Sequence, residues 1–180
     1  MSKKLVSREQ LENDKRFFIN PDTLSSLMKH HKIFCYDMAN IKIGRIRRYK
    51  DKKLSTLYDT DNYRYVANPG AEENRAAYRA YCSKKENLKD NPDRSEALFN
   101  ELIGKFGRED YDPEKGVIII DQYNCIVDGF HRSCILLHRF GPEHEITVLK
   151  IKYETGYRIK LLSPFFELNQ RLKHNKKTEV

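Results

Sequence analysis

The apolar positions between residues 117 and 152 form the clearest pattern in the chain. Val117 to Ile120 is a run of β-branched residues, which is typical of a buried strand. After a turn, a second short apolar segment follows, and apolar residues then recur at helical spacing until Gly141-Pro142 ends the pattern. These positions predict a strand at 117–120, a turn at 122–124, a strand at 125–127, a helix at 130–140 and a strand at 145–152.

Helix-capping residues and the spacing of apolar residues predict the remaining elements. Ser7 to Gln10 has the form of a capping box, and Asn20-Pro21 pairs a helix cap with proline at the first helical position. Ser163-Pro164 predicts the start of a last helix in the same way. The other predicted elements are strands at 32–38 and 41–49 with a turn at 37–40, a polar loop at 50–62, a short strand at 63–66, and helices at 71–86 and 95–106.

Together these elements predict a single α+β domain over residues 1–180, with a small mixed sheet packed against helices. The chain is 39% hydrophobic and contains nine Phe and eleven Tyr, which excludes a disordered protein. Residues 174–180 are expected to form a flexible basic tail.

Several classes of protein are excluded by what the chain lacks. No apolar run reaches the length of a membrane span, and the N-terminal residues lack the apolar segment of a signal peptide. We therefore expect a cytoplasmic protein without a membrane partner. The cysteines show no CxxC pairing and are interpreted as reduced thiols, most of them in the core; they are Cys35, Cys82, Cys125 and Cys134.

The formal net charge of +8 indicates an anionic partner but does not identify it. The densest group of cations is Arg45, Arg47, Arg48 and Lys50. Basic patches attract phosphate in nucleic acids, nucleotides and sugar phosphates alike. A solvated strand end explains the same group equally well.

Polar residues interrupt the apolar pattern where the second strand meets the helix, in the stretch IVDGFHRSCI. Gly129 permits a tight turn and a close approach of a ligand to the backbone, at a helix start where backbone N–H groups lack partners. Cations are unfavourable at a helix N-terminus unless an anion is bound there, so His131 and Arg132 predict a phosphate site.

Two other interpretations of this stretch stay open. In the first, Asp128 caps the helix, His131 bonds internally and Arg132 pairs with Glu143 or Glu145. In the second, three zinc-binding residue types share one helix face. They are His131, Cys134 and His138, but no second Cys/His cluster is spaced to complete the site, so no metal ligands are assigned.

The order strand, turn, strand, DGFHR, helix, GP, strand over residues 111–153 resembles the ParB N-terminal/sulfiredoxin-like superfamily, as a stand-alone domain. In that superfamily a Gly-x-His-Arg or Gly-x-Arg-Arg turn opens a helix and binds the phosphates of CTP, ATP or ADP. The resemblance implies nucleotide phosphate binding by Gly129, His131 and Arg132, and makes residues 60–110 a helical insertion. Ser133 would add a hydroxyl in the first turn. Arg45 and Arg47 would lie on the family's first strand and close the other side.

Two departures narrow what the resemblance implies. Sulfiredoxins place their catalytic cysteine directly before His-Arg, where this chain has Phe130, so reduction of sulfinic acids is not expected. Partition proteins continue into a helix-turn-helix domain, whereas only 27 residues follow Tyr153 here. A role in DNA segregation of the usual architecture is therefore not expected.

We expect a nucleotide-dependent phosphotransferase that acts on a small molecule, with ATP or another nucleotide and Mg²⁺. Asp128 and His131 are the expected catalytic residues, and Glu72, Glu73 and Asp121 are further candidates for the base. The alternative is a non-catalytic nucleotide- or nucleic-acid-binding module. Stand-alone relatives suggest a role in bacterial surface-polysaccharide synthesis. The residues predict no oligomeric state.

Overall fold

The computed structural model describes residues 5–83 and 92–154; the helix expected at Ser163 and the tail expected at 174–180 lie outside these residues. The helices are α1 (Arg8–Glu12), α2 (Pro21–His30), α3 (Asp61–Ala67), α4 (Glu72–Ser83), α5 (Pro92–Phe106) and α6 (Phe130–Phe140). The strands are β1 (Ile33–Lys42), β2 (Arg47–Lys50), β3 (Lys53–Thr56), β4 (Ile119–Asp121), β5 (Ile126–Asp128) and β6 (Glu145–Tyr153). Single 3₁₀ turns are η1 (Ile43–Arg45), η2 (Leu57–Asp59) and η3 (Pro113–Lys115).

A four-stranded mixed sheet in the order β1-β6-β4-β5 forms the centre of the fold. β4 pairs antiparallel with β5 and parallel with β6, and β6 pairs antiparallel with β1. The parallel pair is connected through β5 and α6, because parallel neighbours require a crossover. The predicted succession of two strands, a helix and a strand is confirmed, and so is the α+β class.

Both faces of this sheet are covered by helices, and side chains that alternate along β4 and the two residues before it pack against both layers. Val117 and Ile119 pack in one hydrophobic cluster with residues of α1 and α2. Ile118 and Ile120 pack in the other cluster, with residues of α3 to α6. All four side chains are buried, so the central strand is fixed in register from both sides.

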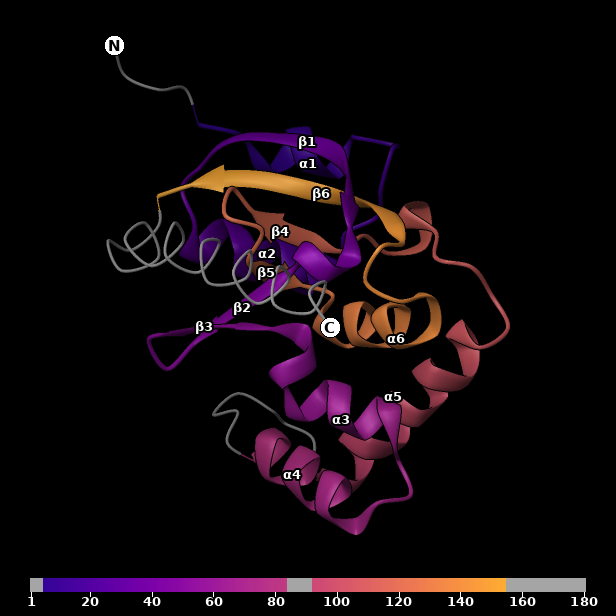
Figure 1. Cartoon of the computed structure of the whole chain (residues 1–180). Helices are drawn as coiled ribbons and strands as arrows, with labels where there is room; N and C mark the ends of the chain where they lie inside the picture. Colours follow the sequence, from indigo (N-terminus) through magenta and orange to yellow (C-terminus); the bar gives the residue numbers. More distant parts are fainter. Residues whose placement is uncertain (1–4, 84–91, 155–180) are drawn as a thin grey trace, which may run out of the picture.

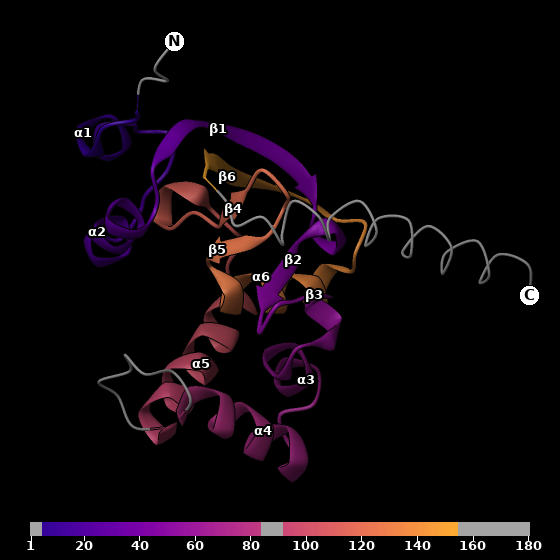
Figure 2. The same ribbon diagram turned by 90° about the vertical axis from the view of Figure 1, so that its left-hand side faces the viewer.

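Helices α3, α4 and α5 form a group on the side of α6 that faces away from β1 (Figures 1 and 2). Tyr65 of α3 stacks on Tyr78 of α4 at 4.8 Å between ring centroids, and on Phe99 of α5 at 5.7 Å. Glu96 of α5 is buried and pairs with Arg75 of α4 at 2.7 Å. The residues predicted as helices 71–86 and 95–106 thus form one aromatic and ionic unit, within the part of them that the structure describes.

Several predictions on the N-terminal half are wrong. The strand predicted at 41–49 is interrupted by the turn η1 (Ile43–Arg45), and its residues are divided between β1 and β2. Residues 37–40 form no turn, because β1 continues through them and pairs with β6 along its length, from Ile33 opposite Tyr153 to Lys42 opposite Glu145. The aromatic residues at 63–66 form no strand, because Thr60 caps helix α3 and packing of Tyr65 inside the helical group outweighs its β propensity. Part of the loop predicted at 50–62 is the hairpin of β2 and β3, with positive φ at Asp51 and Lys52.

Two further expectations concern the state of the cysteines and the presence of a membrane-spanning segment. Cys82, Cys125 and Cys134 are buried and free, whereas Cys35 is free and exposed. Burial raises the pKa of the Cys125 and Cys134 thiols to about 12. Among the residues that the structure describes, no helix is long and apolar enough to cross a membrane.

The passage from β5 into α6 depends on Gly129. This residue has φ +83° and ψ +22°, in the left-handed region that glycine adopts readily. A Cβ at this position would lie 2.9 Å from Cγ1 and 3.1 Å from Cα of Ile118. The helix therefore begins in direct backbone contact with the central strand, and Gly129 is required for both the turn and the contact.

We expect Gly129→Ala to lower the free energy of unfolding by about 1–3 kcal/mol, because it combines left-handed strain with a clash. Gly104→Ala is the matched control: it lies inside α5 with no atom within 4 Å of the added Cβ. It should raise the stability by about 0.5–1 kcal/mol. Urea unfolding monitored by circular dichroism measures both changes; equal effects of the two substitutions would contradict this account of Gly129.

A thiol titration tests the burial of the cysteines. An aromatic disulfide reagent at neutral pH should react rapidly with Cys35 and slowly with Cys82, Cys125 and Cys134, because buried neutral thiols are poor nucleophiles. All four should react in denaturant. Cys35→Ser should abolish the rapid phase, and a rapid phase that persists in this variant would show that a core thiol is accessible.

Candidate anion site at the start of α6

A cavity of about 330 Å³ lies at the start of α6, bordered by β2, α4 and β5. Among the described residues that line it, the basic side chains are Arg48, His131 and Arg132, and Asp128 is the one carboxylate. Its other lining residues are Tyr49, Tyr81, Leu102, Ile126, Val127, Gly129 and Phe130. The balance of charge on its wall therefore favours an anion.

The helix start itself contributes to this balance. No side chain caps α6, so Asp128 does not have the capping role that one interpretation of the sequence gave it. The first backbone N–H groups of a helix have no intrahelical partner and carry the positive end of the helix dipole. Gly129 adds no side chain that would cover them. These groups are suited to bind the oxygen atoms of a phosphate.

Arg48 brings a second cation to the cavity from β2. Its guanidinium lies over the ring of Phe130 at 4.3 Å and over the ring of Tyr81 at 4.9 Å. Lys50, two residues further along the same strand, lies over Tyr81 at 5.0 Å. Alternate residues of a strand point to the same side, so β2 presents Arg48 and Lys50 together. The sequence places Arg48 in a basic group but does not single it out.

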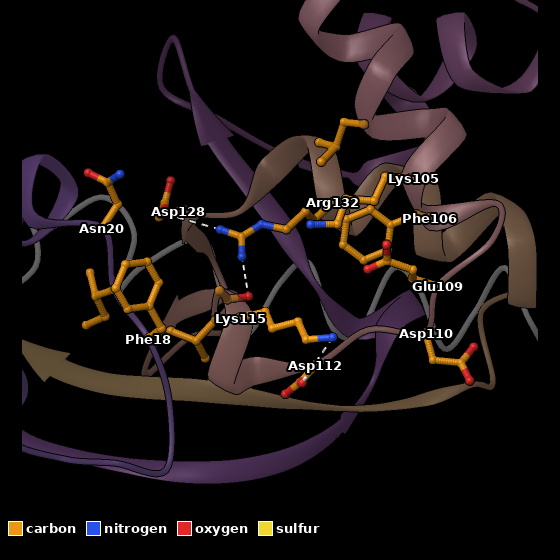
Figure 3. Close-up of a pocket in the computed structure, with 14 residues that line it drawn as sticks. Phe18, Asn20, Lys105, Phe106, Glu109, Asp110, Asp112, Lys115, Asp128 and Arg132 are labelled. Atoms are coloured by element: carbon orange, nitrogen blue, oxygen red, sulfur yellow. Dashed lines mark hydrogen bonds and ion pairs between the residues drawn. The ribbon is translucent and has the colours of Figure 1, made fainter.

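Arg132 forms one wall of the cavity and is held at two points (Figure 3). One terminal nitrogen donates a hydrogen bond to the carbonyl oxygen of Gly116, and the other lies 3.6 Å from the carboxylate of Asp128. A guanidinium has five N–H donors, so these contacts leave donors for a ligand. The interpretation in which Arg132 pairs with Glu143 does not hold in this structure, where Lys42 pairs with Glu143 at 2.6 Å.

His131 is held by the helical group. Its Nε2 atom lies 3.2 Å from the hydroxyl of Tyr78 on α4, and its ring lies 4.3 Å from the ring of Phe99 on α5. Burial raises the pKa of Tyr78, so this hydroxyl stays protonated; it donates to the carbonyl oxygen of Ser95 at 3.4 Å, and its oxygen can accept from the Nε2–H of the imidazole. Helices α4 and α5 therefore orient a side chain that lines the cavity.

Three residues expected to bind phosphate lie elsewhere. Ser133 is fully buried and its hydroxyl donates to the carbonyl oxygen of Gly129 at 3.0 Å, within the helix. Arg45 is exposed on η1, and Arg47 is buried with its backbone N–H bonded to Asn124. None of the three lines the cavity. Arg47 and Arg48 are adjacent on one strand, so their side chains point to opposite sides.

The further candidates for a catalytic base are also separate from the cavity. Glu72 and Glu73 are exposed in the first turn of α4. Asp121 is fully buried at the end of β4, where its Oδ1 atom accepts hydrogen bonds from the backbone of Tyr123 and Cys125, each at 2.8 Å. Burial raises the pKa of Asp121. Asp121 shapes the β4–β5 turn, and Asp128 is the carboxylate that reaches the cavity.

The zinc interpretation has little support in the geometry. Cys134 is fully buried and its sulfur lies 3.8 Å from the hydroxyl of Thr60. Burial raises the pKa of this thiol, which opposes the thiolate that zinc requires. Within residues 5–83 and 92–154, no three His, Cys, Asp or Glu side chains are grouped so that they could hold a metal ion.

A second cavity, of about 260 Å³, lies on the other side of Arg132 (Figure 3). It is formed by the segment before α2, the end of α5 and the turn η3. Its lining residues are Phe18, Ile19, Asn20, Leu102, Lys105, Phe106, Glu109, Asp110, Asp112, Lys115, Gly116, Val117, Asp128 and Arg132. Asp128 and Arg132 line both cavities, so they stand at the boundary between two adjacent spaces.

Comparisons of this chain with protein-family models, with curated proteins and with solved structures gave no match. The assignment of a function therefore depends on the two cavities and the residues between them.

Proposed function

We propose that this protein binds the phosphate groups of a nucleotide at the start of α6 and transfers a phosphoryl group from it to a small molecule. The observation that carries this proposal is the convergence of the uncapped helix start, Arg48 and Arg132 on one cavity. Arg132 lies in the first turn of α6, whereas Arg48 comes from β2, far away in the sequence, so the meeting of Arg48 with the helix start is not a consequence of local sequence. Phosphate is a suitable ligand for these groups, because it carries negative charge and its oxygen atoms can accept several hydrogen bonds.

The aromatic residues of the cavity support a nucleotide over inorganic phosphate. Tyr49, Tyr81 and Phe130 line it and offer apolar surface beside the cations. Mixed apolar and charged walls are suited to a ligand that joins an apolar ring to an anionic chain. A nucleotide is such a ligand, since it joins an aromatic base to a chain of phosphates.

Asp128 supports chemistry beyond binding. A phosphate cradle gains nothing from a carboxylate, which repels the ligand, unless that group orients a metal ion or an acceptor hydroxyl. Mg²⁺ usually accompanies nucleotide phosphates and is held in large part by their oxygen atoms and by water, so Asp128 is left to orient the acceptor hydroxyl. The ion would neutralise phosphate charge, while Arg48, Arg132 and the helix start would position the phosphate chain.

The resemblance to the ParB N-terminal/sulfiredoxin-like superfamily agrees with this proposal. The stretch with Gly129, His131 and Arg132 opens α6, in the order of elements that the resemblance implies. On this proposal the protein works in the cytoplasm, where nucleotides are abundant and thiols stay reduced.

The hairpin of β2 and β3 supports a second candidate, a nucleic-acid-binding module. Arg48, Lys50, Lys52 and Lys53 lie on this hairpin, and none of them forms an ion pair with a carboxylate of the described residues. Such a module would show strong salt dependence with long polyanions and no turnover.

The first test concerns nucleotide binding. Arg48→Ala and Arg132→Ala should each weaken the binding of ATP by about 1–3 kcal/mol, the cost of a lost charge-assisted hydrogen bond. Arg45→Ala is the matched control, since it removes the same charge from an exposed position outside the cavity. Isothermal titration calorimetry, repeated with CTP and GTP, measures the affinities.

An equal loss in all three variants would indicate general electrostatics and favour the nucleic-acid module. Unchanged affinity in folded Arg48→Ala and Arg132→Ala proteins would remove the proposed site.

The second test separates catalysis from binding. Asp128→Asn and His131→Ala should lower kcat by about a hundredfold or more, because groups that act on a transferring phosphoryl group act mainly in the transition state. The dissociation constant of the nucleotide should change much less. Phosphorus NMR of wild-type protein with ATP, Mg²⁺ and a panel of alcohols detects the product. Tight nucleotide binding without any acceptor-dependent product would show a binding module.

A further inference from the structure

We infer that the second cavity is the acceptor subsite of this phosphotransferase and that it takes a small neutral polyhydroxylated molecule, a sugar or polyol. This inference rests on the proposed function and goes beyond it by naming the acceptor class. It follows from the position of the cavity, the balance of its charges and the pattern of its donors and acceptors.

The position of the cavity suits the second substrate of a transfer reaction. Both cavities are lined by Asp128, Arg132 and Leu102, so a ligand in one lies directly beside a ligand in the other. The side chain of Asp128 is 39% exposed and that of Arg132 is 21% exposed, so both can contact ligands. Transfer requires the two reacting atoms to come within van der Waals distance, which adjacent sites with a shared wall allow.

The charges of the second cavity are balanced within the protein, unlike those of the first. Lys115 lies 4.0 Å from Asp112, Arg132 lies 3.6 Å from Asp128, and Arg139 lies 3.6 Å from Asp110. The remaining charged lining residues, Lys105 and Glu109, carry opposite signs, and the backbone N–H of Glu109 donates to the carbonyl oxygen of Lys105 at 2.9 Å just beyond the end of α5. Together with Arg139, the charged residues of this cavity carry no net charge, so a neutral ligand is favoured over one with net charge.

The polar groups of the lining suit hydroxyls. Glu109, Asp110 and Asp112 accept hydrogen bonds, whereas Lys105 and Lys115 donate them. A hydroxyl both donates and accepts, so a molecule with several hydroxyls can bond to both kinds of partner at once. A ligand with only acceptors would leave the carboxylates without a hydrogen bond, and a ligand with only donors would leave the lysines without one.

The cavity also contains apolar surface, which suits the C–H groups of a sugar, in the form of two aromatic rings. Phe18 is 48% exposed, although large apolar side chains are usually covered, and it lines the cavity together with Phe106. Figure 3 shows the two rings on opposite sides of the cavity, with charged side chains between them. The C–H face of a sugar ring could pack on the exposed ring of Phe18 while its hydroxyls bond to those side chains. The volume of about 260 Å³ favours one ring over a longer saccharide.

The transfer step follows from this arrangement. A hydroxyl oxygen of the acceptor forms a bond to the terminal phosphorus of the nucleoside triphosphate, and the bond from that phosphorus to the bridging oxygen breaks. The nucleoside diphosphate leaves with the electron pair of that bond, and the hydroxyl proton passes to the carboxylate of Asp128. The products are a phosphate monoester of the acceptor, the diphosphate and one proton.

Ligand-observed saturation-transfer NMR tests the acceptor class without turnover. The probes are glucose, mannose, N-acetylglucosamine, myo-inositol and glycerol, with methylammonium and acetate as charged controls. We expect at least one of the neutral probes to bind wild-type protein with a dissociation constant below about 10 mM, the range of weak small-ligand complexes. Neither charged control should bind as tightly.

Variants assign the binding to the second cavity. Phe18→Ala and Glu109→Gln should each weaken the bound probe fivefold or more and leave ATP affinity within twofold. Leu98→Ala is the matched control, because Leu98 is 48% exposed, as Phe18 is, and lines neither cavity. It should change neither affinity. Phe18 and Glu109 are exposed at their positions, so folded variants are expected.

The outcomes separate this inference from the proposed function. ATP binding without binding of any neutral probe would overturn the acceptor class and leave the nucleotide site intact. Probe binding that Phe18→Ala and Glu109→Gln do not weaken would overturn the assignment to this cavity. Probe binding that these variants weaken, in a protein that does not bind ATP, would support the sugar site and remove the phosphotransferase.

Discussion

The contact between the backbone of Gly129 and Ile118 is the constraint on which the candidate site depends. Ile118 belongs to the central segment of the sheet, with neighbours packed on both faces, so it cannot yield to a larger residue. Because α6 starts against it, the first turn of the helix is fixed relative to Gly116, two residues before Ile118. Arg132 can then donate to the carbonyl oxygen of Gly116 and remain between the cavities. A shift of the helix start would separate these groups.

Helices α3 to α5 do more than cover the sheet. The stacked rings of Tyr65, Tyr78 and Phe99 form a rigid unit, and two of them contact His131. Tyr81 of the same unit contacts Arg48. The helical segment thus positions one side chain from α6 and one from β2, which are far apart in the sequence. A catalytic or binding site requires such support because its side chains must hold their orientation before the ligand arrives.

The sequence predicts α6 well and β1 poorly, for physical reasons. Glycine stands at both ends of α6 with positive φ, and the apolar spacing between them is helical, so local signals suffice. The polar residues at 37–40 resemble a turn, and only pairing with β6, more than a hundred residues later, keeps them extended. Thr60 likewise caps α3 although aromatic residues follow it.

The same distinction applies to the site. Asp128, Gly129, His131 and Arg132 are contiguous, and the sequence identifies them. Arg48 reaches the cavity and Arg47 does not, because neighbouring residues of β2 point to opposite sides of the strand. The side that faces α6 is set by the pairing of β2 with β3 and by the bridge between Arg47 and Cys125. The second cavity combines four separate segments, so no local pattern could predict it.

The position of Arg132 links the two proposals through competition for one guanidinium. In this structure Arg132 is paired with Asp128, and the pair is partly exposed, so it contributes little to stability. A phosphate at the start of α6 would offer the guanidinium a second anion with more acceptor oxygens. The N–H donors of Arg132 would then be divided between the phosphate and Asp128, and the ion pair between Arg132 and Asp128 would weaken. The carboxylate of Asp128 would then be available to accept a hydrogen bond from the acceptor hydroxyl. Binding of the first substrate could in this way prepare the group that acts on the second, with no larger movement than that of one arginine side chain.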